Sequence, residues 1–226
     1  MLNSQNEIEL MNVSKSFKGR IILKEINLKI PKGCAIGFVG SNGSGKSVLF
    51  KLIVGLIKPD QGEVYIKGSK LGEDFDFPDE TGILIDKPGY IDVYDGFNNL
   101  SFLANIKGKI DSEMIRNTME LVGLDPDNKT KVRNYSMGMK QKLGIAQAIM
   151  EGQNLIILDE PFNALDAKSY GEVKDIIKKL RDNGSTVLLT SHNYNDIEEI
   201  CDLSYIIIDS TLEKLTDDIK QKYSIH

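Results

Sequence analysis

The sequence predicts an α/β fold with a mainly parallel sheet, antiparallel strands at the N-terminus and an inserted helical segment. Short apolar runs alternate with helical patterns at both ends of the 226-residue chain, as in sheets whose strands are buried on both faces. A glycine-rich turn directly follows one of these runs. From Pro88 to about Gly152 no buried strand is evident. Residues 1–87 and 152–226 are therefore expected to form one α/β core, and residues 88–151 a helical subdomain.

The N-terminal part contains short apolar runs bounded by glycine, proline and polar turn residues. The strands expected there are Glu7–Val13, Ile21–Ile30, Cys34–Val39, Glu63–Ile66 and Gly82–Ile85. A helix is expected to begin inside Gly45–Ser47 and to end near Gly55, because glycine commonly follows the last helical turn. Its inner side is expected to carry Val48, Leu49, Leu52 and Ile53.

The inserted part is expected to be helical over Asp111–Val122 and Ser136–Met150, where apolar residues recur at helical spacing. In the first of these helices the spaced residues are Met114, Ile115, Met119 and Val122. Strands and helices then alternate again to the end of the chain. The strands expected there are Leu155–Leu158, Thr186–Thr190 and Tyr205–Ile208, and the helices are Ser169–Leu180, Asn193–Ile200 and Thr211–Gln221.

The composition limits the class of protein. Hydrophobic residues make up 41% of the chain and charged residues 27%, as in ordinary soluble globular proteins. The net charge of -5 argues against a nucleic-acid partner held by bulk electrostatics. No stretch approaches the roughly 18 apolar residues of a membrane span, and polar Met1–Glu9 is not expected to be a signal peptide. We therefore expect a cytoplasmic protein, whose membrane part, if it has one, belongs to another subunit.

The segment Gly40–Ser47 reads Gly-Ser-Asn-Gly-Ser-Gly-Lys-Ser and lies between an expected strand and an expected helix. Its glycines let the backbone approach phosphates closely, with successive N–H groups directed at anionic oxygens. Lys46 is expected to place its charge between the outer phosphates, and Ser47 to offer a hydroxyl to Mg²⁺. The pattern predicts binding of a nucleoside triphosphate, ATP. The residues expected to bind it are Gly40, Ser41, Asn42, Gly43, Ser44, Gly45, Lys46, Ser47 and Val48.

The apolar run Leu155–Leu158 ends in two adjacent carboxylates, Asp159 and Glu160. Open parallel sheets bind their ligands at the carboxyl ends of their strands. Asp159 is therefore expected to hold Mg²⁺. Glu160 is expected to orient and polarise the water that attacks the phosphate, as positioning residues do in phosphoryl transfer.

Four further segments complete a known order of motifs. They are Ser14-Lys15-Ser16-Phe17, Tyr135-Ser136-Met137-Gly138-Met139, Asn163-Ala164-Leu165-Asp166 and Thr190-Ser191-His192. With them the chain resembles the ATP-binding subunits of ABC transporters over nearly its whole length. The resemblance implies a single ABC ATPase domain over residues 1–226, with a P-loop NTPase core that binds ATP and Mg²⁺.

The resemblance also implies roles for single residues. Phe17 occupies the position of an aromatic that stacks on adenine. His192 matches a switch histidine that contacts the γ-phosphate and holds Glu160 and the water in place, so that Lys46, Glu160 and His192 are the catalytic set. Ser136 and Gly138 match the family's signature segment, which meets ATP held by a partner subunit. Asp166 lies in the loop through which two such subunits communicate.

One residue departs from the family pattern. Asp86 follows the strand that precedes the helical insertion, where the family usually has a glutamine that senses Mg²⁺. A carboxylate there could bind the metal more strongly or repel the γ-phosphate in its absence. Together with the methionines of the segment Tyr135–Met139, Asp86 resembles a branch that includes bacteriocin- and antibiotic-export ATPases.

The expected function is ATP hydrolysis in a head-to-tail dimer that drives transport, in the direction of export, through a separate membrane subunit. The partner cassette is expected to be a second copy, and the chain to lie on the cytoplasmic face of the membrane. Pro88–Phe97 is the expected docking surface, unless its aromatics simply pack the helical part. Two alternatives stay open, namely a soluble ABC-type ATPase acting on ribosomes or DNA and a switch that scarcely hydrolyses. A GTPase is excluded, because Asn128-Lys129-Thr130-Lys131 lacks the aspartate of a guanine-recognition motif.

Overall fold

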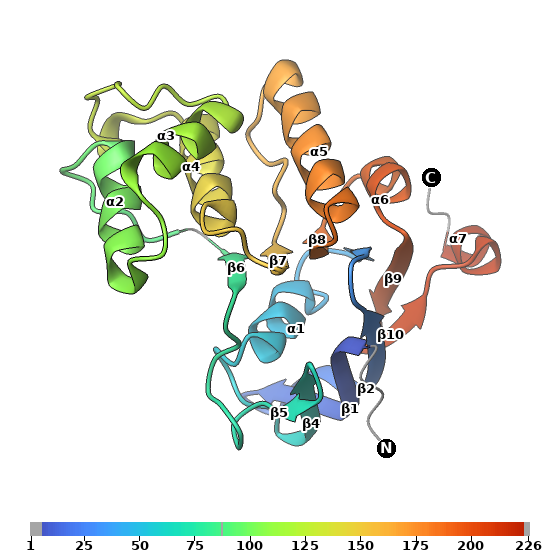
Figure 1. Ribbon diagram of the computed structural model, residues 1–226. Coiled ribbons are helices and arrows are strands. Elements are labelled where there is room, and N and C mark those ends of the chain that lie inside the picture. The colour runs from blue at the N-terminus through green and yellow to red at the C-terminus, as the bar shows by residue number, and fades with distance from the viewer. Residues whose placement is uncertain (1–5, 87, 224–226) are drawn as a thin grey trace.

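The computed structural model describes residues 6–86 and 88–223 and contains two sheets (Figure 1). The first five residues of the stretch Met1–Glu9, and Lys87 at the expected end of the N-terminal core segment, lie outside the described residues. The smaller sheet is antiparallel, in the order β2-β1-β4-β5. Its strands are β1 (Asn6–Phe17), β2 (Arg20–Pro31), β4 (Gln61–Ile66) and β5 (Ser69–Lys70).

The larger sheet has six strands in the order β10-β9-β3-β8-β7-β6. All neighbouring strands in it are parallel except the pair β9 and β10. Its strands are β3 (Ala35–Val39), β6 (Thr81–Leu84), β7 (Leu155–Leu158), β8 (Thr186–Thr190), β9 (Leu203–Ile208) and β10 (Thr211–Lys214). The predicted fold class, a mainly parallel α/β core with antiparallel N-terminal strands and inserted helices, is confirmed.

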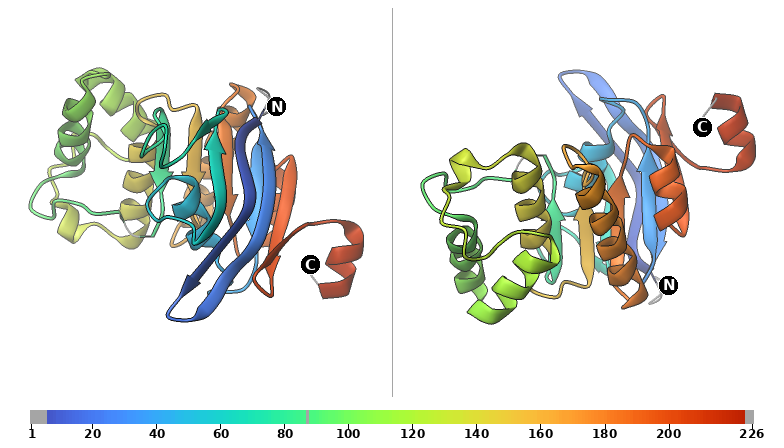
Figure 2. Two further views of the ribbon diagram at one scale, coloured as in Figure 1. Left: turned by 90° about the horizontal axis from the view of Figure 1, so that it is seen from below. Right: turned by 90° about the horizontal axis from the view of Figure 1, so that it is seen from above.

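Helices cover both faces of the larger sheet. They are α1 (Lys46–Ile53), α2 (Gly96–Lys107), α3 (Ser112–Leu121), α4 (Met137–Ile149), α5 (Ala167–Asp182), α6 (Tyr194–Ile200) and α7 (Asp217–Tyr223), with a short 3₁₀ turn at Val132–Asn134. Helix α1 lies between the two sheets (Figure 1). Helices α2–α4 lie together at one side of the molecule and α7 at the other (Figure 2).

Alternation along the buried strands divides the interior into two cores. Ile36 and Phe38 of β3 face α1 and the antiparallel sheet, whereas Ile156 and Leu158 of β7 face α4 and α5. Successive side chains of a strand point to opposite faces, so every second residue serves each core. Helix α4 lies so close to β6 that a Cβ atom on Gly82 would be 1.7 Å from the Ala148 carbonyl oxygen. Helix α4, which begins directly after Ser136, therefore packs directly on the sheet.

The expectation of a helix over Thr211–Gln221 is wrong. Thr211–Lys214 is strand β10, paired antiparallel with β9, and α7 begins only at Asp217. The reason is a two-residue turn, because Asp209 and Ser210 have φ angles of 49° and 65°. Two consecutive left-handed residues form the tight turn that matches the twist of a β-hairpin.

Three smaller differences concern the helices. Met114 faces solvent rather than the core, while Ile115, Met119 and Val122 are buried as expected. In α1 the fully buried set includes Phe50, and Val48 is only half-buried. Helix α2 was not foreseen as a separate element, because exposed Phe102 and Ile106 obscure its apolar stripe. Among the described residues no helix is long and apolar enough to cross a membrane.

Candidate active site

The parallel strands bring the chemistry-bearing segments to one edge of the larger sheet. The glycine-rich loop follows β3, Asp159 and Glu160 follow β7, and His192 follows β8. Strands β3, β8 and β7 are adjacent and parallel. Their carboxyl ends therefore meet at the same edge, and the loops there lie side by side.

The glycine-rich loop is shaped for an anion. Gly40, Gly43 and Gly45 have φ angles of 149°, 77° and 114°, which L-residues with a side chain rarely adopt. Helix α1 begins at Lys46, within the last residues of the loop, and no side chain caps it. The N–H groups of its first turn are therefore left for an outside acceptor, which is the usual arrangement of a phosphate site.

Lys46 lies folded over this loop. Its ammonium group donates hydrogen bonds to the carbonyl oxygens of Gly40 at 2.7 Å and Ser41 at 3.3 Å. Burial lowers the pKa of Lys46, and the nearby carboxylates of Glu160 and Asp159 oppose that shift. The ammonium is thus held inside the loop by neutral carbonyls, so a phosphate can take their place as its partner.

Asp159 joins the loop to the sheet. Its Oδ2 accepts a 2.5 Å hydrogen bond from Ser47 Oγ, and its Oδ1 accepts one of 2.7 Å from Thr190 Oγ1. Mg²⁺ prefers oxygen ligands and usually takes one or two from the protein, with the rest from water and substrate phosphates. The described residues contain no cluster of three or more His, Cys, Asp or Glu side chains that could hold a metal. The pair of Ser47 and Asp159 therefore fits a Mg²⁺ that is shared with a bound nucleotide.

The backbone of Glu160 is held firmly. Its N–H donates to Thr190 Oγ1 at 2.8 Å, and its carbonyl oxygen accepts from Gln141 Nε2 of helix α4 at 3.0 Å. Its φ angle of 52° lies in the left-handed region, where a residue with a side chain is strained. Such strain persists only where surrounding contacts hold it, as they do here, and it is frequent at active sites.

The carboxylate of Glu160 is less well satisfied. Its Oε1 is buried and accepts no hydrogen bond, although His192 Nε2 lies 3.1 Å away. Burial raises the pKa of Glu160, and His192 and Lys46 oppose the shift. A buried oxygen without a partner, beside the phosphate loop, can accept a hydrogen bond from a water.

These groups line a cavity of about 250 Å³. Phe17, at the end of β1, forms one wall, and the residue is 46% exposed, so a planar group can stack on its ring. The residues lining the cavity are Phe17, Ile22, Asn42, Gly43, Gly45, Lys46, Ser47, Val48, Asp159, Glu160 and His192.

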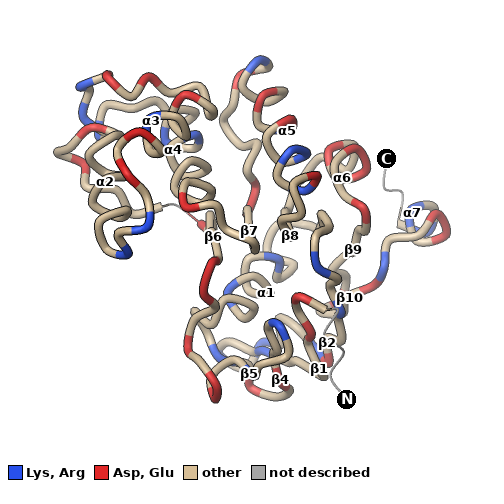
Figure 3. Tube along the Cα trace, viewed as in Figure 1, with Lys and Arg blue, Asp and Glu red and all other residues tan. Residues whose placement is uncertain are grey.

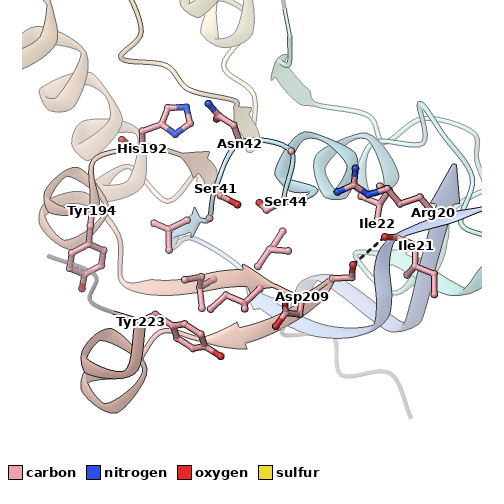
Figure 4. Close-up of a pocket in the computed structure, with 18 residues that line it drawn as sticks. Arg20, Ile21, Ile22, Ser41, Asn42, Ser44, His192, Tyr194, Asp209 and Tyr223 are labelled. Carbon is pink, nitrogen blue, oxygen red and sulfur yellow. Dashed lines mark hydrogen bonds between the residues drawn. The ribbon is translucent and has the colours of Figure 1, made fainter.

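A larger cavity of about 710 Å³ opens on the other side of the same loop. Asn42 and His192 lie along one rim of it, and Asp209 and Tyr223 along the opposite rim (Figure 4). Lys46, Asp159 and Glu160 do not line it. The charged residues expected to act in the reaction therefore line the smaller cavity and not the larger one.

Ser136, Gly138 and Asp166 lie together in a different pocket of about 280 Å³, which shares no lining residue with the phosphate cavity. Ser136 caps α4 by accepting a 3.1 Å hydrogen bond from the Met139 N–H. Asp166 caps α5 in the same way, accepting from the Ser169 N–H at 2.8 Å. A Cβ on Gly138 would lie 2.8 Å from the Ala164 carbonyl oxygen, which explains a glycine at this position.

Asp86 lies apart from both pockets. Its carboxylate forms an ion pair with Lys51 of α1, with 2.6 Å between Oδ2 and Nζ. Neither residue lines the phosphate cavity. To reach a metal held by Ser47 and Asp159, the Asp86 side chain would first have to leave Lys51.

Two residues of the site were missed by sequence reasoning. Thr190 ties Asp159 to the backbone of Glu160, and Gln141 ties α4 to the same backbone. Thr190 lies two residues before His192 in a recognised motif, which was the available signal. Gln141 lies in a helical segment that reads as ordinary, and only the packing of α4 on the sheet reveals its contact.

Comparison with known proteins agrees with this geometry. A family model described as ABC transporter matches residues 23–163. The ABC transporter ATP-binding protein YybJ of Bacillus subtilis (strain 168) is 40% identical over 87% of this chain and 90% of its own length. The bacitracin transport ATP-binding protein BcrA of Enterococcus faecalis is 35% identical over 90% of this chain and 67% of its own. The lantibiotic transport ATP-binding protein SrtF of Streptococcus pyogenes is 31% identical over 86% and 84%.

A solved structure extends the likeness to three dimensions. It is the dimeric post-hydrolysis state of the ATP-binding cassette MJ0796 bound to ADP and Pi, which is 25% identical to this chain. The two superpose with a TM-score of 0.82 over 92% of this chain and 99% of that one.

Proposed function

Because the chain belongs to the ABC transporter family and is an ABC-type ATPase, we propose that two copies pack head to tail around two ATP molecules and power a membrane transporter. Each active site then combines the phosphate cavity of one copy with the Ser136–Gly138 segment of the other. ATP closes the dimer, and hydrolysis lets it open. That motion drives a separate membrane subunit in the direction of export.

In this proposal the nucleotide is held by the glycine-rich loop and α1. The triphosphate replaces the loop carbonyls as the partner of Lys46, and adenine stacks on Phe17. Ser47 and Asp159 hold Mg²⁺, which when bound neutralises charge on the phosphate oxygens. Phosphoryl transfer needs little beyond positioning and charge stabilisation, so these groups account for most of the chemistry.

Glu160 and His192 act on the water. Water attacks the γ-phosphorus, the bond to the oxygen that leaves with ADP breaks, and inorganic phosphate is released. Glu160, with its unpartnered Oε1, orients that water and accepts its hydrogen bond. His192, 3.1 Å from the same oxygen, contacts the γ-phosphate and holds the carboxylate in place.

One observation carries the head-to-tail arrangement. The pocket that contains Ser136, Gly138 and Asp166, called the signature pocket below, shares no lining residue with the phosphate cavity. Ser136 and the start of α4 therefore act on a nucleotide held by a second copy. The dimeric state of the structural neighbour, bound to ADP and Pi, supports this arrangement.

Mixing two inactive variants tests the composite site. Lys46→Ala inactivates every phosphate cavity, and Ser136→Glu every signature pocket, so each homodimer is expected to be inactive. A mixed dimer contains one site in which both halves are intact. Each mixed dimer is therefore expected to recover up to about half of the wild-type turnover, and an equimolar, randomly paired mixture about a quarter. If no activity returns although both variants fold, the head-to-tail site is wrong.

A membrane partner is supported by exposed apolar side chains at the start of the helical segment. Ile91, Val93, Tyr94 and Phe102 are all 40% exposed or more, and the last two rings are in edge contact at 5.0 Å. Tyr90 and Phe97 instead pack against the core, so the expected surface over Pro88–Phe97 is only partly available. We assign its exposed part to a short helix of the membrane subunit, on the cytoplasmic face of the membrane. The bacitracin and lantibiotic transport relatives support export.

Co-purification tests this partner. The wild-type chain is expected to carry a hydrophobic multi-span protein with it from detergent extracts. Val93→Asp is expected to lose that protein while its ATP turnover in isolation is unchanged. Capture of ribosomal RNA or DNA in place of a membrane protein would contradict the transport function and favour a soluble ABC-type ATPase.

A further inference from the structure

Asp196, in the first turn of α6, is a buried carboxylate that the proposed reaction does not use. It is 1% exposed, and donors from two other segments meet it. Its Oδ2 accepts hydrogen bonds from the Tyr170 hydroxyl and, at 3.1 Å, from Ser191 Oγ. Its Oδ1 lies 3.1 Å from Lys174 Nζ. A buried charge is tolerated only when it is paired and hydrogen-bonded, so this carboxylate is fully engaged.

One of these donors belongs to the loop that carries His192. Ser191 Oγ donates to Asp196 and also accepts from the Asn193 N–H at 3.0 Å. The residues on both sides of His192 are thus fixed by one hydroxyl. The imidazole itself is 48% exposed. Its approach to Glu160 therefore depends on the backbone that Ser191 holds.

The other donors belong to α5, which begins directly after the loop containing Asp166. Tyr170 lies in the first turns of α5, and its ring contacts that of Phe162 with 5.1 Å between centroids. Phe162 is buried in the short segment between Glu160 and Asp166. The chain of contacts Phe162, Tyr170, Asp196 and Ser191 is therefore continuous from that segment to the histidine loop.

Lys174 has a second carboxylate that keeps it in place. Glu199 of α6 bonds both Lys174 and Lys178, the latter at 2.7 Å. Basic positions of α5 accordingly lie beside acidic positions of α6 (Figure 3). These ion pairs fasten the two helices to each other, while the Tyr170 and Ser191 contacts of Asp196 reach the functional segments.

We propose that Asp196 is a positioning residue of the ATPase reaction, which sets the His192 loop and couples it to segment 162–166. The proposal rests on the proposed function, in which Glu160 and His192 act on the water and the pocket shared by Ser136 and Asp166 meets the second copy. Movement of segment 162–166 when a second copy docks shifts Tyr170, and through Asp196 it shifts Ser191. The position of His192 beside Glu160 thereby depends on the contact between the two copies.

A double-mutant cycle tests the coupling without leaving a buried charge unpaired. Tyr170→Phe and Ser191→Ala each remove one donor to Asp196, and Lys174 still pairs with it. Each change is expected to lower kcat by about threefold to tenfold and to leave the KM for ATP unchanged, because only positioning for the chemical step is lost. The double variant is expected to be no slower than the slower single variant, since residues that act as a unit are not additive.

Matched variants separate positioning from folding. Ser185→Ala removes a hydroxyl at the opposite end of β8, where it bonds the Gln153 carbonyl oxygen at 3.3 Å, and is expected to leave kcat unchanged. Ser191→Thr keeps the hydroxyl and is expected to recover most of the turnover lost in Ser191→Ala. Losses that multiply in the double variant, or a raised KM in the single ones, would overturn the relay.

Failure of the relay and failure of the proposed function give different results. If Glu160→Gln abolishes turnover while Tyr170→Phe and Ser191→Ala leave kcat unchanged, the function holds and the relay is wrong. If Glu160→Gln hydrolyses ATP at the wild-type rate, the assignment of the reaction itself is wrong.

Discussion

The phosphate cavity and the signature pocket differ in almost every physical respect, although both are built on one chain. The cavity contains a buried lysine and the half-buried Glu160 carboxylate, whose pKa is raised by burial and whose Oε1 has no hydrogen-bond partner. The signature pocket is built around two capped helix starts, with Ser136 and Asp166 both engaged in their own helices. The phosphate cavity thus contains a polar group without a hydrogen-bond partner, whereas Ser136 and Asp166 of the signature pocket already have partners in their own helices.

This difference indicates which region binds nucleotide alone. Unsatisfied donors and a displaceable lysine are an energetic cost in the free protein that a bound triphosphate removes. A satisfied helix start has less to gain, so under the proposed function we expect the signature pocket to complete a site but not to create one. The account therefore predicts that damage to the cavity is severe, and that damage near the signature pocket acts on stability and on assembly.

Lys46→Ala is expected to have the largest effect. It removes the only ammonium that lines the phosphate cavity among the described residues. The loss of a charged hydrogen-bond partner is worth up to about 3 kcal/mol, which weakens ATP binding by roughly a hundredfold. Isothermal titration measures this directly. Lys58→Ala, an exposed lysine outside the cavity, serves as the control, and equal affinities would contradict the phosphate site.

Thr190→Val is expected to reduce turnover by about tenfold to a hundredfold, on the scale of lost positioning in a phosphoryl-transfer site. The change keeps the shape of the side chain but removes the hydroxyl that joins Asp159 to the Glu160 backbone. Steady-state kinetics measure kcat. Thr186→Val is the matched control, since Thr186 is equally buried on β8 and its hydroxyl accepts a hydrogen bond from the Gly33 N–H, at 2.8 Å, away from the site. If both variants lose activity alike, Thr190 has no special place in the site.

Gly138→Ala is expected to destabilise the fold by about 1–3 kcal/mol, the usual cost of overpacking. Its Cβ would meet the Ala164 carbonyl at 2.8 Å, and the backbone on both sides must give way. Urea unfolding measures the free energy, and ATP binding by the single chain is expected to stay intact. Gly171→Ala in α5, where a Cβ meets nothing within 4 Å, is expected to be neutral or stabilising. A stabilised Gly138→Ala would show that the start of α4 does not contact the loop that contains Ala164.

Lys51→Met is expected to have the smallest effect on stability, less than about 1 kcal/mol, because exposed ion pairs contribute little. It frees Asp86, whose carboxylate has Lys51 as its ion-pair partner. The Mg²⁺ concentration for half-maximal turnover is then expected to fall, since Asp86 can turn to the metal. An unchanged Mg²⁺ requirement would mean that Asp86 has no part in metal binding.

The success of sequence reasoning also differs between regions. The loop Gly40–Ser47 and the strand before Asp159 were predictable, because local composition and spacing determine them. The hairpin of β9 and β10 was not, since its turn uses Asp209 and Ser210 in left-handed conformations without glycine. The helix α2 was likewise missed, because two of its large apolar side chains, Phe102 and Ile106, face outward.

Contacts within the site were hardest to foresee. Thr190 lies 31 residues from Asp159 in sequence and Asp86 lies 35 from Lys51; only the strand order makes such pairs neighbours. The family resemblance assigned roles to Glu160 and His192. It did not reveal that Glu160 Oε1 is buried without a hydrogen-bond partner, with His192 Nε2 3.1 Å away.

ATP-dependent dimerisation of Glu160→Gln tests the central claim most directly, because this variant is expected to bind ATP without hydrolysing it. Light scattering after gel filtration gives the mass. With saturating ATP and Mg²⁺, the account predicts twice the 25.2 kDa mass of the chain, and the single mass in ADP. A chain that binds ATP fully in a titration and yet stays at 25.2 kDa would contradict the composite site.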